Sequence, residues 1–207
     1  MTNQTSVRAR PDTSADGVEG NARLTATAAA LLLVLLAAEG ATLLSIHGLL
    51  KAHVFIGFAL IPPTALKIGT TGYRFARYYT RSGTYRRKGP PPLILRVLGP
   101  VVVLTTVSLL ASGVALGTTS RSTRDAMLFL HKASFVIWFA AMTVHVLGHL
   151  FEVVKLGSRD WRPTPSASDV VAGAGVRRWG MAAVIVIACF VGVYGLSSLG
   201  PWTALSH

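Results

Sequence analysis

Five long apolar stretches dominate this sequence and constrain its fold more than any other feature. They run approximately over residues 24–46, 52–73, 97–119, 126–151 and 179–200. A helix needs about 20 mostly apolar residues to cross a bilayer, because each unpaired backbone N–H or C=O group left in lipid costs several kcal/mol. We therefore predict an all-α integral membrane bundle of five transmembrane helices, forming one domain over residues 23–200.

The composition supports this interpretation. Of the 207 residues, 51% are hydrophobic and 14% are charged, whereas an ordinary soluble domain has about 25% charged residues. A net charge of +12 could suggest nucleic-acid binding, but that activity needs a basic face on a solvated domain. Here the basic residues lie in short segments between apolar stretches, so we expect no nucleic-acid partner. The single cysteine, Cys189, allows neither an intrachain disulfide nor a multi-cysteine metal site.

The distribution of Lys and Arg predicts the orientation of the chain. Fifteen of these residues lie at the amino-terminal end, after the second stretch or after the fourth stretch. They are Arg8, Arg10, Arg23, Arg74, Arg77, Arg81, Arg86, Arg87, Lys88, Arg96, Lys155, Arg159, Arg162, Arg177 and Arg178. The opposite segments hold only Lys51, Arg121 and Arg124.

Because cytoplasmic loops carry the excess of Lys and Arg, we expect a polar, disordered tail over residues 1–22 in the cytoplasm. The short tail over residues 201–207 is expected outside the cell membrane. The second and fourth stretches then cross the membrane in the same direction. The basic segments hold this topology and contact anionic lipid, or they dock a redox partner protein.

Four histidines lie inside the predicted spans, where ionisable groups are costly and mark functional sites. His145 and His149 follow His131 by 14 and 18 residues, and a helix turns about 100° per residue, so all three share one face. His53 and His131 both lie near the outer starts of their helices, at similar depths. Two imidazoles on facing helices can ligate one haem iron. Gly57, one turn after His53, would let a flat macrocycle approach the backbone.

This pattern resembles the transmembrane b-type cytochromes, a group that includes respiratory cytochrome b and bacterial cytochrome b561-like membrane subunits. In the di-haem members, two helices each carry two histidines about 14 residues apart, with one haem near each surface. His131 and His145 match that spacing, whereas Lys67 stands 14 residues after His53. The resemblance covers about residues 24–152. It implies haem b held by His53 and His131, and a second haem at the inner end.

The inner end leaves several alternatives open. An inner haem could be ligated by His145, by His149 or by a neutral Lys67. Lys67 could instead contact a haem propionate or a quinone oxygen, or extend its ammonium to the inner surface. His145 and His149 could also hold a divalent metal, because they lie one turn apart. At the outer end, we expect Glu39 to pair with Lys132 or with the far nitrogen of a ligating histidine.

The functional hypothesis is electron transfer between a quinol, or another redox partner, and an associated oxidoreductase subunit. We expect this chain to be a non-catalytic subunit, because the sequence has no phosphate-binding Gly-rich loop or dinucleotide motif. The alternative is a haem-free small transporter or assembly anchor, whose histidines are hydrogen-bonded or carry protons. The stretch over residues 179–200 has neither histidine nor charge, so we expect it at the periphery of a haem-binding core of four helices.

Overall fold

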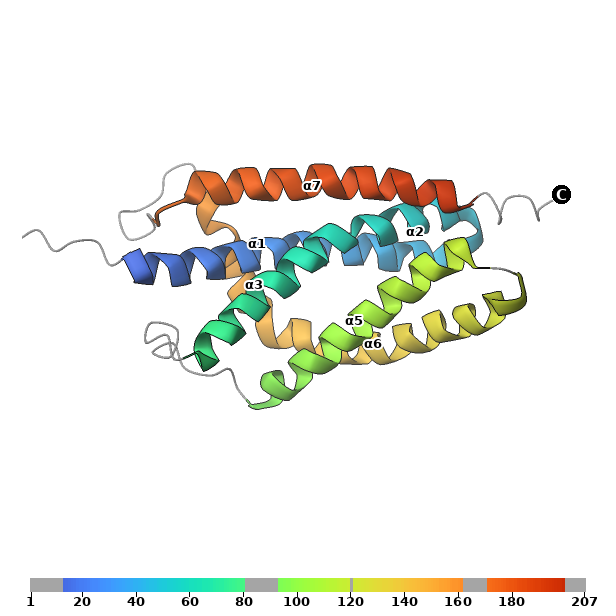
Figure 1. Cartoon of the computed structure of the whole chain (residues 1–207), viewed down its shortest axis with the longest axis horizontal. Helices are drawn as coiled ribbons and strands as arrows, with labels where there is room; N and C mark the ends of the chain where they lie inside the picture. The colour runs from blue at the N-terminus through green and yellow to red at the C-terminus, as the bar shows by residue number, and fades with distance from the viewer. Residues whose placement is uncertain (1–12, 81–92, 120, 162–170, 200–207) are drawn as a thin grey trace, which may run out of the picture.

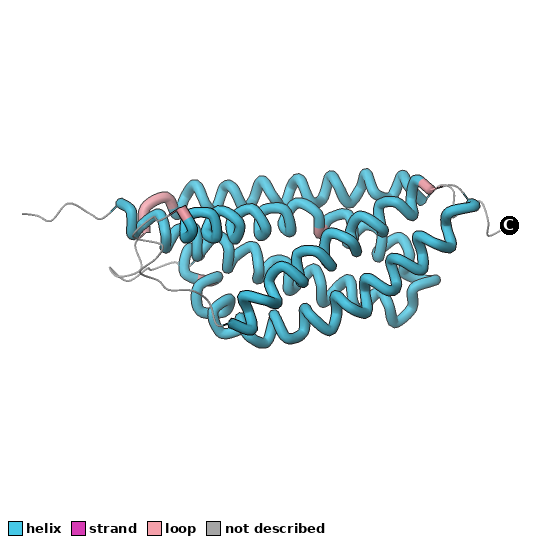
Figure 2. The backbone as a smooth tube through the Cα atoms, turned by 60° about the horizontal axis from the view of Figure 1, so that its bottom comes forward, coloured by secondary structure: helices cyan, strands magenta, loops and turns pink. Residues whose placement is uncertain are grey.

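The structure, a computed structural model, describes residues 13–80, 93–119, 121–161 and 171–199, and its regular elements are all helical. The long helices are α1 (Thr13–Thr42), α2 (Ile46–Ala59), α3 (Ile61–Tyr79), α5 (Leu93–Thr118), α6 (Arg121–Gly157) and α7 (Ala174–Leu196). Three short 3-10 turns are η1 (Leu43–Ser45), η2 (Arg159–Trp161) and η4 (Ser197–Leu199). The helices run along one long axis (Figures 1 and 2). The predicted all-α class is confirmed.

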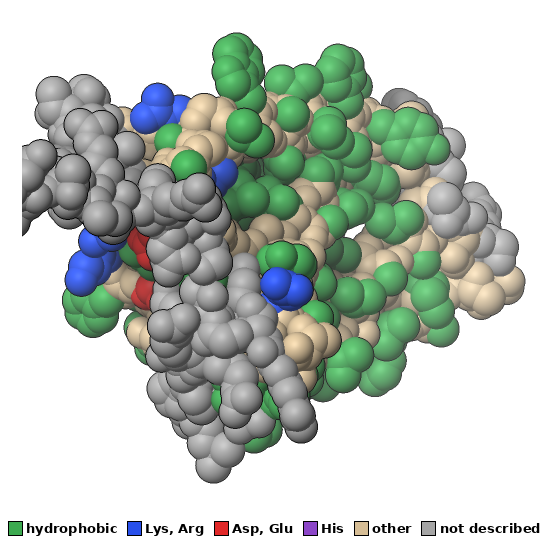
Figure 3. Space-filling model, turned by 60° about the vertical axis from the view of Figure 1, so that its left-hand side comes forward, with side chains coloured by type: hydrophobic (Ala, Val, Ile, Leu, Met, Phe, Trp, Pro, Cys, Tyr) green, Lys and Arg blue, Asp and Glu red, His purple; other side chains and the backbone are tan. Residues whose placement is uncertain are grey.

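Four helical segments of the described chain are long and apolar enough to cross a membrane. They are Gly17–Tyr79, Val97–Gly117, Ser122–Trp161 and Ala174–Leu199. Large apolar side chains such as Phe129 and Phe190 are exposed on the outer faces, and hydrophobic groups cover much of the face drawn in Figure 3. Because soluble proteins rarely expose apolar patches of this extent, the chain has the surface and the helices of a multi-pass membrane protein.

The first of these segments is 63 residues long and folds back on itself at η1. The side-chain amide of Asn21 donates to the carbonyl of Thr70 at 3.2 Å, and the ammonium of Lys67 donates to the carbonyl of Thr25 at 3.4 Å. In these pairs the sequence number rises on α1 as it falls on α3, so α1 lies antiparallel to α2 and α3. Two of the five predicted spans, over residues 24–46 and 52–73, thus form a helical hairpin.

A break at Leu60 separates α2 from α3. Pro62 and Pro63 lie in the first turn of α3, where proline is tolerated because its missing N–H has no intrahelical acceptor. The backbone N–H groups of Leu60 and Thr64 still bond to the carbonyls of Ile56 and Leu60, at 2.9 and 3.1 Å. The chain therefore passes from α2 into α3 with these two backbone N–H groups still bonded.

Helix α7 packs against α2 and α3, and α5 packs against α6 (Figure 1). Gly192 and Gly195 face the rings of Phe55 and Phe58, and a Cβ atom at either glycine would collide with its facing ring. Small residues allow membrane helices to approach closely, so these two glycines set the distance between α7 and α2. Of the described residues that line the central cavity, none lies on α7.

A buried cluster of charges joins α1, η2 and α7 at one end of the bundle. Arg23, whose side chain is 2% exposed, donates to Glu19 and to Asp160, each at 3.2 Å. Arg177 bonds Asp160 through two nitrogens, and Arg178 donates to its backbone carbonyl. Charged side chains gather at this end in Figure 3. Three elements distant in sequence are therefore tied together by one carboxylate.

This cluster explains a wrong boundary in the sequence analysis. The predicted disordered tail covered residues 1–22, but α1 begins at Thr13. The pairing of Glu19 with Arg23 one turn later, and of Asn21 with Thr70, stabilises polar residues in a helical conformation. Residues 1–12 and the predicted outer tail over residues 201–207 lie outside the described residues.

Candidate functional site

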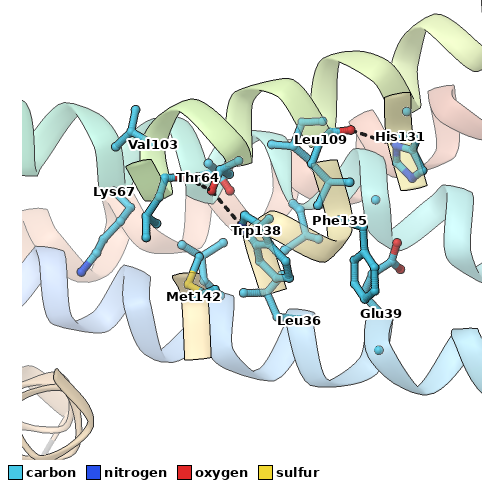
Figure 4. A pocket seen from close by; sticks show the side chains of 18 of the residues that line it. Leu36, Glu39, Thr64, Lys67, Val103, Leu109, His131, Phe135, Trp138 and Met142 are labelled. Atoms are coloured by element: carbon cyan, nitrogen blue, oxygen red, sulfur yellow. Dashed lines mark hydrogen bonds between the residues drawn. The ribbon is translucent and has the colours of Figure 1, made fainter. Parts of the chain in front are cut away.

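A cavity of about 1440 Å³ lies among α1, α2, α3, α5 and α6. Most of its lining is aliphatic or aromatic, and it exceeds the roughly 300–1,000 Å³ typical of small-molecule sites. All the ionisable residues that the sequence analysis proposed as site residues line this cavity. They are Glu39, His53, Lys67, His131, His145 and His149. Figure 4 shows Glu39 and His131 toward one end of the cavity and Lys67 at the other.

His53 of α2 and His131 of α6 meet at the first of these ends, which we call the outer end. Their ring centres are 6.4 Å apart and their ring planes are perpendicular. The two helices are far apart in sequence, and the fold places the two rings side by side. The structure thus brings together the two histidines that the sequence analysis paired.

Nδ1 of His53 is held by two oxygens of α1. The Oε1 atom of Glu39 lies 3.0 Å from it, and the Oγ1 atom of Thr42 lies 2.9 Å from it. The hydroxyl of Thr42 donates its proton to the backbone carbonyl of Glu39, so toward His53 it acts as an acceptor. With the Glu39 carboxylate ionised, Nδ1 of His53 carries the proton and Nε2 keeps its lone pair. This is the tautomer of a histidine that ligates a metal through Nε2.

Nδ1 of His131 is held in the same way by α5. It lies 3.1 Å from the backbone carbonyl of Leu109 and 3.1 Å from the hydroxyl of Ser112. A carbonyl only accepts hydrogen bonds, so Nδ1 is again the protonated nitrogen. Gly113 lies beside this ring, because a Cβ atom added there would be 3.1 Å from Cε1 of His131. Both histidines are thus oriented by groups on a neighbouring helix.

Comparisons with protein-family models, with curated proteins and with solved structures find no match for this chain. Inference about its function therefore depends on the geometry of the cavity and on the chemistry of the residues that line it.

Of the two kinds of contact expected for Glu39, with Lys132 or with a histidine nitrogen, the structure shows the contact with a histidine. The Glu39 carboxylate contacts His53 rather than Lys132, whose side chain is exposed on α6. The Glu39 side chain is 16% exposed, and its Oε2 atom has no hydrogen-bond partner in the described chain. Gly57 also lines the cavity, and a Cβ atom there would lie 3.4 Å from Oε1 of Glu39. The space at Gly57 therefore admits the Glu39 carboxylate beside His53.

The other end, which we call the inner end, has a different set of polar groups. His145 and His149 lie one turn apart on α6, with ring centres separated by 4.9 Å. Nδ1 of His149 contacts Glu152 at 3.3 Å, whereas Nδ1 of His145 is buried and makes no hydrogen bond with the described chain. Lys67 interacts electrostatically with both His145 and Glu152. It also donates to Thr25.

Aromatic and thioether side chains of α6 separate the two ends. Trp138 is buried, and its indole N–H donates to the hydroxyl of Thr106 on α5 at 2.9 Å. Phe135 lies toward the outer end and Met142 toward the inner end, in the order expected from their helical positions (Figure 4). Within the described residues, no group of three or more His, Cys, Asp or Glu side chains is placed to hold a metal ion.

Sequence reasoning did not find the residues that orient the two histidines. Thr42, Leu109, Ser112 and Gly113 are ordinary residues of membrane helices, and Leu109 acts through its backbone carbonyl. Their roles depend on the register of α1 against α2 and of α5 against α6. The one available signal was the position of Glu39, a carboxylate in an otherwise uncharged stretch.

Proposed function

We propose that this chain is a membrane-embedded electron-transfer protein that binds haem b between His53 and His131. The observation that carries the proposal is the pair of imidazoles, each with its Nδ1 atom engaged by a neighbouring helix, with ring centres 6.4 Å apart. When bound, haem b supplies one-electron exchange at its iron. The polypeptide supplies the ligands, their orientation and an apolar enclosure.

The distance between the rings suits two ligands on one metal. With imidazole–metal bonds of about 2 Å and ring centres about 1 Å behind the bonding nitrogens, opposed imidazoles lie about 6 Å apart, centre to centre. Two perpendicular ring planes can both stand upright on a flat group between them. The cavity volume of about 1440 Å³ gives room for such a group, and its apolar lining suits a macrocycle.

The groups hydrogen-bonded to Nδ1 of the two histidines would hold both imidazoles in the orientation of metal ligands. A metal-ligating histidine almost always donates its other N–H to a carboxylate, carbonyl or water, which fixes the tautomer and raises the basicity of the ligand. His53 has a carboxylate and a hydroxyl in this position, and His131 has a carbonyl and a hydroxyl. The acceptors differ, so the two ligands would differ in donor strength.

We further propose that the chain crosses the cell membrane five times. The antiparallel hairpin within Gly17–Tyr79 supplies two crossings, and the remaining three apolar helices supply one each. The fifteen Lys and Arg residues counted above then lie on the cytoplasmic side with the amino terminus, and the carboxyl terminus lies outside. Electrons would pass between a quinol or a redox partner protein and an associated oxidoreductase subunit.

The decisive experiment is the visible spectrum and haem content of the purified full chain. We expect sharp reduced bands of bis-histidine haem and about one haem per chain in the wild type. His53→Ala and His131→Ala should each lose it, because one imidazole is then missing. Lys51→Ala, which changes an exposed residue of α2 outside the cavity lining, is the control and should keep full haem content.

Two results would overturn the proposal. A colourless wild-type protein, after expression with an ample haem supply, would favour the haem-free transporter or anchor. Full haem content in both His53→Ala and His131→Ala would show that the haem is bound elsewhere. Elution of each variant as a single species of wild-type size shows that loss of haem does not come from misfolding.

A further inference from the structure

The outer end of the cavity carries a basic side chain that the proposed ligation by His53 and His131 does not use. This side chain is Lys132, which follows His131 directly on α6, lines the cavity and is also exposed. Leu43 of η1 and His47 in the first turn of α2 line the same cavity. The cavity therefore extends to the outer turn between α1 and α2, where an ionised group can reach water.

The ammonium of Lys132 makes no ion pair or hydrogen bond with the residues that the structure describes. The sequence gave Glu39 as a possible partner, but the Glu39 carboxylate contacts Nδ1 of His53 instead. An ammonium has three N–H donors and no acceptor, and beside an apolar surface it keeps its charge by contacting water or an anion. Lys132 is thus a cation that a ligand in the cavity can use.

The proposed ligand is an amphiphilic group. Haem b has an apolar macrocycle, which matches the apolar lining of the cavity, and two propionate carboxylates on one edge. These carboxylates are ionised at neutral pH, and an ionised carboxylate is costly to bury without a partner. A haem between His53 and His131 could turn this edge toward the outer turn or toward the inner end. The positions of the lysines that line the cavity decide between these two orientations.

Lys67, the other lysine that lines the cavity, is too distant to meet a carboxylate of a haem at the outer end. It follows His53 by 14 residues, which is about 21 Å along helical chain at 1.5 Å per residue, and a propionate arm is only three carbons long. Lys67 also donates to the carbonyl of Thr25 and interacts electrostatically with Glu152. Lys132, in contrast, is the chain neighbour of a proposed ligand, so its ammonium can reach the edge of the macrocycle.

We infer that Lys132 binds a propionate of the haem, so that the carboxylate edge of the macrocycle faces the outer turn and its apolar edge faces Trp138 and the inner end. Lys132 then determines specificity in two ways. It selects a porphyrin with free carboxylates, and it sets which way round the group is bound. The inference rests on the proposed function, because it concerns the haem that this function requires.

The test compares haem with haem dimethyl ester, in which both carboxylates are esterified and uncharged. Each compound is titrated into the full chain, prepared without haem in lipid nanodiscs, and its dissociation constant is measured from the visible absorption. The ratio of the two constants is compared between proteins, because differences in partition into the lipid then cancel. We expect the wild type to bind haem about tenfold or more tightly than the ester, as expected for a hydrogen bond from a charged donor.

The variants separate Lys132 from the other lysines of the chain. In Lys132→Met the preference for haem should disappear, because haem binds more weakly while the ester binds as it does to the wild type. Lys132→Arg keeps a cation at this position and should keep most of the preference. Lys67→Met, at a cavity-lining lysine of the inner end, and Lys51→Met, at an exposed lysine outside the cavity lining, are the matched controls. Both should keep the wild-type preference.

Three results would overturn the inference. Equal weakening of haem and ester binding in Lys132→Met would show that Lys132 acts through the protein, for example through Glu39, and not on a carboxylate. Loss of the preference in Lys67→Met, with Lys132→Met unchanged, would turn the carboxylate edge inward. A wild type that binds both compounds equally would refute the inference and leave the proposed function standing, whereas a wild type that binds neither would refute both.

Discussion

The position of Gly113 leads to a prediction that tests the outer site without removing a ligand. A Cβ atom at this position would lie 3.1 Å from Cε1 of His131. Carbon atoms pack best about 3.5–4.0 Å apart, so in Gly113→Ala the imidazole would have to move by about 0.4 Å or more. Nδ1 of His131 is held at 3.1 Å by both Leu109 and Ser112, so the shift would strain these two hydrogen bonds.

The expected size of the effect follows from these contacts. Metal–ligand distances tolerate deviations of only about 0.2 Å, so the ring cannot move this far and keep both its ligand bond and its orienting hydrogen bonds. Weakening one hydrogen bond costs about 1 kcal/mol, which corresponds to about fivefold weaker haem binding. Gly113→Val places more atoms against the ring and should reduce haem content further.

The assay is the rate at which purified protein loses haem to an excess of a haem-scavenging protein. Gly99→Ala is the matched control, because Gly99 lies on the same helix and a Cβ atom there meets nothing within 4 Å. We expect Gly113→Ala to lose haem about five times faster than wild type, and Gly99→Ala to lose it at the wild-type rate. Equal rates in Gly113→Ala and wild type would refute the assignment of His131 as a ligand held against α5.

Three other predictions concern the second ligand, the charge cluster and the topology. Thr42→Val removes one of the two acceptors of the His53 N–H, so haem should be lost up to about tenfold faster, and an unchanged rate would contradict this role. Asp160→Asn should lower the thermal unfolding temperature markedly, because breaking a buried ion pair costs about 3–5 kcal/mol, whereas Asp125→Asn, at an exposed position, should not. Ser206→Cys, combined with Cys189→Ala to remove the native thiol, should react with a membrane-impermeant maleimide added to intact cells. Protection of that cysteine until the cells are lysed would reverse the proposed orientation.

The helical period was enough to predict which face of α6 matters. His131, Trp138, Met142, His145 and His149 all line the cavity, as expected for residues that share one face of a helix turning about 100° per residue. The proximity of His53 and His131 was also predictable, since each lies shortly after the start of its apolar stretch. These arguments use only periodicity and the distance from a membrane surface.

The contacts that orient the histidines were beyond sequence reasoning. Glu39 could have met either Lys132 or a histidine, and the choice depends on α1 packing beside α2 rather than beside the outer end of α6. Similarly, the burial of Arg23 depends on Asp160, which is 137 residues away in the chain. Local patterns carry no information about such registers, so the start of α1 and the partners of Nδ1 required the structure.

The two ends of the cavity differ in a way that bears on how many haems the chain can hold. At the outer end, both imidazoles have their Nδ1 atoms engaged by the protein, which is how ligating histidines are oriented. At the inner end, Nδ1 of His145 has no partner in the described chain, and the residue available from α3 is Lys67. An inner haem held by His145 and Lys67 would therefore have one ligand that nothing in the described chain orients and another of an uncommon type. These differences favour the outer end as the place of the proposed haem, and a haem content near one per chain is the expected consequence.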